Sequence, residues 1–517
     1  MVTGKDEQDI TEVRACALRV KPADRERIKG RTLSDARRIA KNIALITGGG
    51  VFRAVLMPLF TIFIARELGT QGFGAFSFAL SLASILVIVG EMGLPKMVVR
   101  ELTNHREDVA KYIGDLSVLR LIAGVASMGI VAMILALTPR APDTRIPLFL
   151  IGLSLLVFTG LRRFFDAIFQ AFEVMKYQAL VDMVDILLTF GVGTALLFSG
   201  YGLMGIAFAM MVGATISMAM DFIILTRKLG KPVFTFDLAF WKRMALGALP
   251  FGIIGVLTFL FGYSNTVLLS IFKGDEQAGL FSSAYRVIWM LAIIPATCMT
   301  AVFPFLARIG RSSDNRQKDA IRLVVKYLAC LSLPFSGLLA IYAPQIISAV
   351  YGKSYSSAGT ALWILAAIPL FSFAYIPLID LMNSQYKQRF SVIAILLCAG
   401  INTALCLLLA PLLGMVGAAV STLVAEACLF GITIFFSWKH MRLHPRIFNL
   451  WKPLVASLTA ALGMLPLRNV LPLPMMLIAF FLVYLAALLL LRTFDMEDRK
   501  LLGSLLPAKS GPGGSNG

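Results

Sequence analysis

Residues 69–94 read GTQGFGAFSFALSLASILVIVGEMGL, a glycine-rich opening followed by a long apolar run. From Phe73 to Leu94 this run contains a single charged side chain, Glu91. An α-helix of about 20 apolar residues is long enough to cross the hydrocarbon core of a bilayer. The stretch therefore predicts a membrane-spanning helix that starts directly after a short loop.

Runs of the same kind recur along the whole chain. About fourteen are predicted, near residues 43–65, 73–94, 117–137, 146–166, 178–199, 202–225, 246–271, 279–304, 323–343, 358–381, 390–411, 414–437, 452–468 and 473–492. Only 15% of the 517 residues are charged and 58% are hydrophobic, so a water-soluble fold of this length would lack a polar surface. The predicted fold class is an all-α polytopic membrane protein with about 14 transmembrane helices.

The formal net charge of +19 is explained by where the 48 Lys and Arg residues lie. Most fall in the N-terminal arm, the even-numbered loops and the C-terminal tail; the loop after span 2 is predicted to hold Lys96, Arg100, Arg106, Lys111 and Arg120. The odd-numbered loops hold only Arg66, Arg140, Arg145, Lys273, Lys353 and Arg468. Because cation-rich loops stay in the cytosol, both termini are predicted to be cytosolic. The charge then requires no nucleic-acid partner.

Two parts of the chain repeat each other. GTQGFGAFSFA (69–79) and GDEQAGLFSSA (274–284) share Gly, Gly, Phe, Ser and Ala at matching positions, and GLMGIA (202–207) similarly matches GMVGAA (414–419). These echoes predict two parallel six-helix bundles around a central cavity, with two extra C-terminal helices. Parallel repeats of this kind are a transporter architecture, in which the substrate path runs between the repeats.

The predicted domain organisation follows from the spans and the repeat. It consists of a basic flexible cytosolic arm (1–41), an N-terminal six-helix bundle (42–228), a cytosolic linker (229–245), a C-terminal six-helix bundle (246–438), helices 13 and 14 (439–495) and a flexible cytosolic tail (496–517).

The motifs of an enzyme or a metalloprotein are missing from the sequence. There is no Walker A motif, and the three histidines, His105, His440 and His444, fall in predicted cytosolic loops. The six cysteines have no spacing typical of a disulfide framework or a metal site, so no metal and no cofactor is predicted. The predicted outside loops are too short for a catalytic domain. A transporter is therefore predicted rather than an enzyme, with a membrane-embedded polysaccharide polymerase or glycosyltransferase as the less favoured alternative.

Four segments carry a family resemblance. They are ARELGTQGFGAFSFALSLASILVIVGEMGLPKMVVREL (65–102), FQAFEVMKYQALVD (169–182), KGDEQAGLFSSAYRVIWMLAIIPATCMTAVFPFLARI (273–309) and LLGMVGAAVSTLVAEA (412–427). In order and spacing they resemble the polysaccharide-biosynthesis (O-antigen-type) flippases of the multidrug/oligosaccharidyl-lipid/polysaccharide exporter superfamily. One departure is YSNT (263–266), near the end of span 7, where members of that family often carry an acidic residue.

The resemblance implies a function. It implies a bacterial inner-membrane flippase that moves an oligosaccharide on a polyprenyl diphosphate from the inner to the outer leaflet by alternating access. Its partners would be membrane lipids and, with them, a polysaccharide polymerase and glycosyltransferases. A drug/cation antiporter or a peptidoglycan-precursor flippase of the same fold remains an alternative.

Two arginines lie well inside predicted spans, away from the span ends: Arg53 in span 1 and Arg286 in span 8. Charged residues within the membrane are costly and are candidate functional sites. The guanidinium fork and permanent charge of Arg suit a diphosphate, and the resemblance implies cavity arginines on these two spans. Both are predicted to bind substrate, although a snorkelling or structurally paired arginine would give the same pattern.

Further candidates lie at the ends of spans or within them. The resemblance implies a gate or salt-bridge residue near Glu91. Lys96 and Arg100 share one helical face near the cytosolic mouth, where they would attract the diphosphate or simply follow the positive-inside pattern. The candidates for binding a coupling ion are Glu426, Asp182, Asp185, Asp221 and Asp380.

Overall fold

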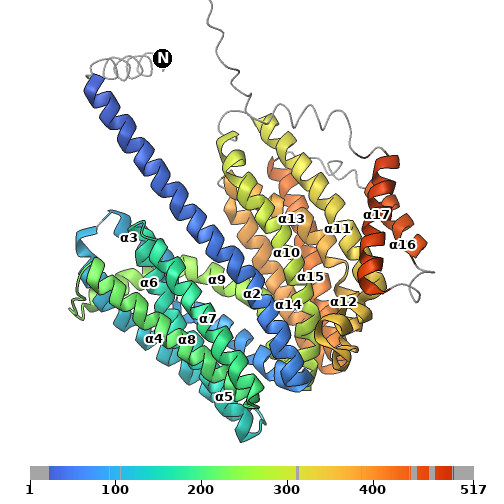
Figure 1. Ribbon diagram of the computed structural model, residues 1–517, viewed down its shortest axis with the longest axis horizontal. Coiled ribbons are helices and arrows are strands. Elements are labelled where there is room, and N and C mark those ends of the chain that lie inside the picture. Colours follow the sequence, from blue (N-terminus) through green and yellow to red (C-terminus); the bar gives the residue numbers. More distant parts are fainter. Residues whose placement is uncertain are drawn as a thin grey trace, which may run out of the picture.

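The computed structural model describes residues 22–91, 93–104, 106–309, 314–385, 387–441, 443, 451–464, 472–491 and 493 (Figure 1). Side chains are described in these ranges from residue 56 onward, except at 104, 254, 301, 304, 305, 307–309, 314–316, 464, 473 and 474. Every regular element in these residues is a helix.

The helices form two halves and a C-terminal pair. The N-terminal half contains α2 (Pro22–Glu91), α3 (Leu94–Asn104), η1 (Arg106–Asp108), α4 (Val109–Leu137), α5 (Pro142–Leu153), the π-helix η2 (Ser154–Thr159), α6 (Gly160–Ala171), α7 (Lys176–Phe198) and α8 (Gly202–Lys228). The C-terminal half contains α9 (Leu238–Lys273), α10 (Asp275–Ile309), α11 (Asp314–Tyr351), η3 (Lys353–Tyr355), α12 (Ala358–Leu365), α13 (Ile368–Ser384), α14 (Gln388–Leu413) and α15 (Met415–Met441). The pair is α16 (Trp451–Met464) and α17 (Leu473–Leu490).

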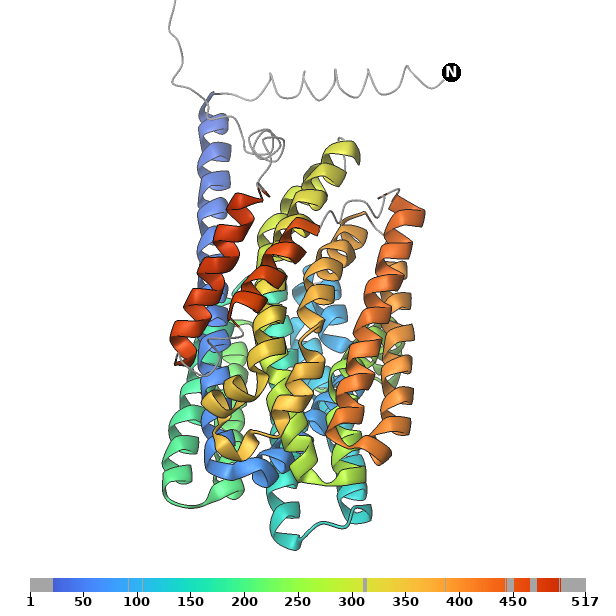
Figure 2. The same cartoon turned by 90° about the vertical axis from the view of Figure 1, so that its right-hand side faces the viewer.

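Figure 1 shows α3–α8 gathered on one side of the molecule and α10–α17 on the other. Within the described residues the predicted spans coincide with helices. Spans 1 and 2 form the two limbs of α2, span 4 covers α5, η2 and α6, and span 10 covers α12 and α13. The C-terminal pair packs on α11, where the Tyr484 hydroxyl donates to the Cys330 carbonyl at 2.6 Å. Figure 2 shows α16 and α17 on the outside of the C-terminal half.

The described residues contain ten helices long and apolar enough to cross a membrane, or up to eleven if α12 and α13 are one bent span. One of the ten, Leu56–Thr103, includes the end of the first limb of α2, the whole second limb and most of α3, and Met475–Leu490 is a shorter apolar helix. Large apolar side chains such as Leu137, Phe198 and Leu490 are mostly exposed, as lipid-facing residues should be. The chain is a multi-pass membrane protein. The predicted total of 14 spans and the predicted domain boundaries stay predictions, and residues 1–21 and 494–517 lie outside the described residues.

A glycine turns the chain at equivalent places in the two halves. Gly69 joins the two limbs of α2 with φ 67° and ψ −177°, and Gly274 joins α9 to α10 with φ 87° and ψ 173°. Residues with a Cβ rarely adopt such positive φ values. These two glycines occupy matching positions in the sequence repeat, so the repeated sequence encodes a repeated helical hairpin. We call the end of the molecule that contains both turns the closed end.

The two halves are tied together at the closed end. Arg140, in the loop between α4 and α5, donates to the Asp275 carboxylate at 2.7 Å. Here the N-terminal half supplies the donor; from the C-terminal half, the Tyr355 hydroxyl donates to the Ala65 carbonyl of the N-terminal half at 2.7 Å. Arg66 adds a hydrogen bond from Nε to the Val350 carbonyl at 2.8 Å. These contacts seal the interface between the halves on this side.

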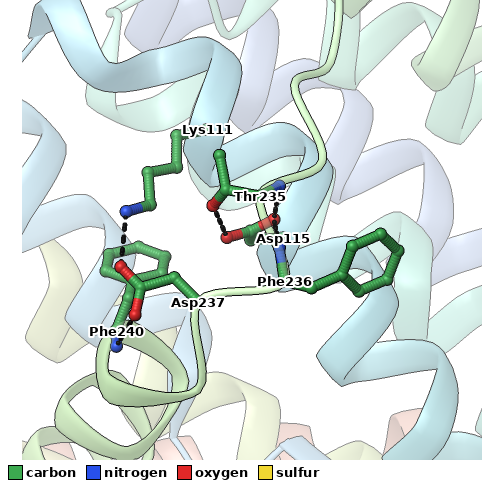
Figure 3. Close-up of polar contacts among 6 residues, drawn as sticks. All are labelled: Lys111, Asp115, Thr235, Phe236, Asp237 and Phe240. Atoms are coloured by element: carbon green, nitrogen blue, oxygen red, sulfur yellow. Dashed lines mark hydrogen bonds and ion pairs between the residues drawn. The ribbon is translucent and has the colours of Figure 1, made fainter.

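The chain between the halves is fixed to α4 at the other end of the molecule (Figure 3). Asp115 accepts hydrogen bonds from the backbone N–H groups of Thr235 at 2.7 Å and Phe236 at 3.2 Å. Lys111 lies 2.8 Å from Asp237, which also caps α9 by accepting from the Phe240 N–H. Because this cap starts α9 at Leu238, the predicted linker 229–245 overlaps the first turns of that helix. We call this side the linker end.

Four residues assigned to the loop after span 2 are in fact α-helical: Lys96 and Arg100 lie on α3, and Lys111 and Arg120 lie on α4. α4 begins at Val109 and includes Lys111 and Arg120, because the helix extends beyond its most apolar segment. Arg120 is 2% exposed and donates to the carbonyls of Leu156 and Gly160, each at 3.3 Å. The π-helix η2 shifts the backbone hydrogen-bond register at this point, and the buried guanidinium donates to one carbonyl within η2, Leu156, and to one directly after it, Gly160.

Candidate substrate cavity

A cavity of about 340 Å³ lies between the two halves. It is formed by both limbs of α2 together with η2, α9 and α10, so the first helices of each repeat build it. Its lining residues are Met57, Pro58, Thr61, Ser77, Leu80, Ser81, Ser84 and Leu155 from the N-terminal half, and Gly262, Tyr263, Thr266, Ser282, Tyr285, Arg286, Trp289, Met290 and Ile293 from the C-terminal half.

Arg286 is the charged residue in this lining. It is half-buried, and its guanidinium carbon lies 5.5 Å from the centroid of the Phe73 ring, a cation–π contact. Among the described residues it has no carboxylate partner within ion-pair distance, and the lining contains no Asp or Glu. The positive charge is therefore available to an anionic ligand.

Aromatic rings and hydroxyl groups complete the cavity wall. Trp289 is 50% exposed, and its ring centroid lies 6.1 Å from that of Tyr263 and 6.4 Å from that of Tyr285. Across from them, Ser77 has a hydroxyl with no hydrogen-bond partner among the described residues. Ring faces, hydroxyl groups and one cation are groups that can bind a sugar attached to an anionic headgroup.

The residues predicted to bind substrate do not all meet here. Arg286 lines the cavity, whereas Glu91, Lys96 and Arg100 are not in its lining. Arg53 lies on α2, four residues before the cavity-lining Met57, and its side chain lies outside the described residues.

Glu91, Lys96 and Arg100 instead cluster near the linker end. Glu91 is buried and lies 3.6 Å from Arg163 of α6. Lys96 and Arg163 line a separate cavity of about 250 Å³. Arg100 lies 3.4 Å from Glu101 on the same helix, α3. Glu91 therefore forms a salt bridge, and its partner is Arg163, which was not among the candidates from the sequence.

The five candidate coupling carboxylates fall in both halves. Asp182 and Asp185 of α7 lie 2.7 Å and 3.8 Å from Arg162 of α6, and Asp221 of α8 is buried beside them. Glu426 of α15 is buried and hydrogen-bonds to Tyr375. Asp380 lies half-buried on α13. The described residues contain no group of three or more His, Cys, Asp or Glu side chains arranged to hold a metal ion.

Asn265 belongs to the stretch YSNT (263–266), near which members of the resembled family often carry an acid, and it joins three helices of the C-terminal half. Its amide donates to Asn402 of α14 at 3.0 Å and to Thr422 of α15 at 2.7 Å. Asn402 donates in turn to the Phe261 carbonyl at 3.1 Å. The neighbouring Thr266 lines the cavity, so this buried network holds α9 in place behind the cavity wall.

Several charged residues were missed by the sequence analysis, namely Arg120, Arg140, Arg162, Arg163 and Asp166. Arg120 was counted as a loop cation, and Arg162 and Arg163 lie near the end of predicted span 4 without having been singled out. One sequence signal could have identified two of them. Arg162 and Asp166 are four residues apart, which places them on one helix face, and they lie within a run of Phe and Ala residues.

Fold and cavity together define the class as a multi-pass membrane transporter made of two helical halves. The chain belongs to the family of polysaccharide biosynthesis proteins, whose profile matches residues 39–310, more than half of the chain. The profile of lipid II flippase MurJ matches residues 243–491.

Individual relatives agree with this family, and solved structures share the fold. A putative O-antigen transporter of Shigella flexneri is 23% identical over 372 residues, covering 69% of this chain and 88% of that one. A probable low-salt glycan biosynthesis flippase, Agl15, of Haloferax volcanii is 21% identical, covering 73% and 79%. The fold resembles that of lipid II flippase MurJ in an inward closed conformation, with a TM-score of 0.72, 16% identity, and 89% and 100% of the two chains covered. An inward-facing multidrug MATE transporter gives a TM-score of 0.62 at 14% identity, covering 75% and 94%.

Proposed function

We propose that this protein flips a lipid-linked oligosaccharide across the bacterial inner membrane by alternating access between its two halves. The anionic headgroup binds in the cavity beside Arg286, the sugars lie against the aromatic wall, and the lipid tail stays in the bilayer. The halves then rock about the repeat axis and release the sugar on the other side. The protein acts as a transporter and not as an enzyme.

The observation that carries this proposal is the charge of the cavity. Arg286 lies in a lining without carboxylates among the described residues. A drug/cation antiporter would need negative charge in its cavity to compensate a cationic cargo. A diphosphate matches the arginine instead, so the anionic cargo is favoured over the cationic one.

Other residues have proposed roles around this centre. Arg53 lies one helical turn before Met57, and residues four apart share a helix face, so we expect it to add a second cation to the cavity. The Glu91–Arg163 pair, with Lys96 beside it and Arg100 on the same helix, forms the entrance at the linker end. In the proposed orientation, the linker end and both termini are cytosolic and the closed end faces outward. Glycosyltransferases supply the cargo on the cytosolic side, and a polysaccharide polymerase consumes it after it has been flipped.

Deleting the gene tests the function directly. The cell should accumulate a lipid-linked sugar on the cytosolic face and lose the surface polysaccharide built from it. Normal surface polysaccharide without any accumulated lipid-linked sugar would contradict the proposal. The expression of neighbouring genes must be restored in the deletion strain, so that the loss is assigned to this chain.

A peptidoglycan-precursor flippase is the second candidate, favoured by the MurJ profile match to residues 243–491. That cargo also carries a diphosphate, so Arg286 would serve both. The deletion strain separates them: accumulation of the peptidoglycan precursor together with cell lysis would replace the oligosaccharide by this cargo.

A further inference from the structure

The N-terminal half buries a cluster of charged side chains away from the substrate cavity. Arg162 and Asp166 come from α6, Asp182 and Asp185 from α7, and Asp221 from α8. We call these five residues the aspartate cluster. They lie roughly two to three turns inside the ends of α7 and α8 at the linker end, and none of them lines the cavity beside Arg286.

One arginine faces four carboxylates in this cluster. Arg162 donates to Asp182 at 2.7 Å and lies 3.8 Å from Asp185, while its side chain is 4% exposed. One guanidinium compensates about one carboxylate charge. With all four aspartates ionised the cluster would hold a large negative excess inside the membrane, and burial of such charges is strongly unfavourable.

Asp221 is the member that the arginine does not satisfy. The residue is 0% exposed, and neither carboxylate oxygen has a hydrogen-bond donor among the described residues. The charged groups that act on it from the packed helices are Asp166 and Arg162 on α6 and Asp182 and Asp185 on α7. An ionised carboxylate without donors, surrounded by three others, would be far less stable than a neutral carboxylic acid.

We propose that Asp221 binds a proton in this conformation and that the aspartate cluster exchanges this proton during the transport cycle. The inference rests on the proposed transport function for its role, although proton binding itself needs no substrate. A proton is favoured over a metal ion because the described residues show no group of acids arranged to hold a metal. Asp182 keeps 26% of its side chain exposed and is the contact of the cluster with its surroundings.

The cluster is linked to the cavity through continuous helix. α6, which carries Arg162, continues directly from η2, and Leu155 of η2 lines the cavity. α7 and α8 approach so closely that a Cβ on Gly213 would lie 3.1 Å from Asp185 Oδ1. Loss of the proton from Asp221 would draw Arg162 away from α7 and shift α6. The same shift would move the cavity wall at η2.

Infrared difference spectroscopy of the purified full-length protein in liposomes tests proton binding without any substrate. Wild-type protein should show the C=O stretching band of a buried protonated carboxyl, and Asp221→Asn should remove it. Asp143→Asn, at an exposed acid on α5, serves as the matched control and should keep the band. An unchanged band in Asp221→Asn, or no such band in the wild type, would overturn the proposal.

A second variant covers the case in which Asp221→Asn does not fold. Asp221→Glu keeps the carboxyl group and should shift the frequency of the band, whereas an identical band would overturn the proposal. Loss of the wild-type band on adding Na⁺ at constant pH would also overturn it, in favour of a cation site. When a lipid-linked substrate is added to the liposomes, Asp221→Asn should still flip it down its concentration gradient. Its flipping rate should no longer respond to a pH gradient, and an unchanged response would contradict the coupling role. Because the infrared band is measured without substrate, proton binding can be disproved while the flippase function stands. The flippase function can likewise be disproved while proton binding stands.

Discussion

Gly74 and Gly279 pack against each other across the interface of the two halves. A Cβ built on either glycine would lie 2.9 Å from the backbone nitrogen of the other. Each would also overlap a carbonyl oxygen of the opposite half, Asp275 for Gly74 and Thr70 for Gly279. These four residues occupy matching positions in the two repeats, so the contact is symmetric. The closed end therefore closes through backbone contact that only glycine permits.

Gly74→Ala should prevent the closed end from closing. The added methyl group has no space, so the halves must separate and the cavity opens on that side. A cysteine placed at Ser77 in the cavity should then react faster with a membrane-impermeant maleimide added from outside the cell. Gly129→Ala on α4, where a Cβ meets nothing within 4 Å, is the control. Equal labelling in Gly74→Ala and the control would be evidence against this role.

The Arg140–Asp275 ion pair should stabilise the same closed state through electrostatic attraction between the two halves. Both side chains are largely buried, at 7% and 14% exposure, and Arg140 also lies 4.0 Å from the Phe78 ring centroid. Removing one partner of a buried pair costs roughly 3–5 kcal/mol, so Asp275→Ala should shift the population strongly toward the open state. The double exchange Arg140→Asp with Asp275→Arg should recover part of the closed population in the same labelling assay. An exchange no better than the single variants would argue against the direct pair.

Gly160 is predicted to be important for the stability of the N-terminal half, because Arg120 occupies the space where a side chain at Gly160 would be. A Cβ there would overlap the guanidinium, so Gly160→Ala should destabilise the N-terminal half by about 1–3 kcal/mol. Arg120→Lys should be similarly destabilising, since an ammonium does not provide the fork that reaches both carbonyls. Thermal unfolding in detergent measures both. Gly191→Ala, at a site with nothing within 4 Å, should change the melting temperature little.

The sequence was sufficient to predict the helices, the membrane class and the family, because each depends on local patterns. Apolar runs predicted where the long apolar helices lie, although α3 falls in the predicted loop after span 2. The echo of Gly69 in Gly274 predicted two equivalent hairpins. Arg286 was found because a cation within an apolar run is visible in the sequence. The family resemblance supplied the expected cargo.

The rest depends on helix rotation and packing, which the sequence does not express. Arg120 was counted as a loop cation and Arg162 was not singled out, because both lie near one end of a predicted apolar run, where a hydropathy profile does not show how far the helix continues. The pairing of Glu91 with Arg163 and of Arg140 with Asp275 joins helices far apart in the chain. Asp221 was a candidate from the sequence, but its neighbours on α6 and α7 became visible only in three dimensions.

The linker should loosen at acid pH. The hydrogen bond from Lys111, and that from the Phe240 N–H, hold the pKa of Asp237 below its ordinary value. A lowered pKa means that the carboxylate stabilises the docked linker above the ordinary pKa and loses this effect as pH falls through the lowered value. A spin label at an introduced Lys231→Cys should become more mobile in that acid range. Asp237→Asn should raise the mobility near neutral pH and weaken the acid transition. A transition unchanged in Asp237→Asn would assign it to another group.

The most direct test of the central claim is the effect of Arg286 on flipping. Loss of a charge-assisted contact to the headgroup should slow flipping roughly 10- to 100-fold. Arg286→Gln should therefore accumulate the lipid-linked sugar on the cytosolic face, at wild-type expression. Arg286→Lys should retain partial flipping, and Arg227→Ala, at an exposed cation on α8, should behave as wild type. Wild-type flipping in Arg286→Gln would contradict the account.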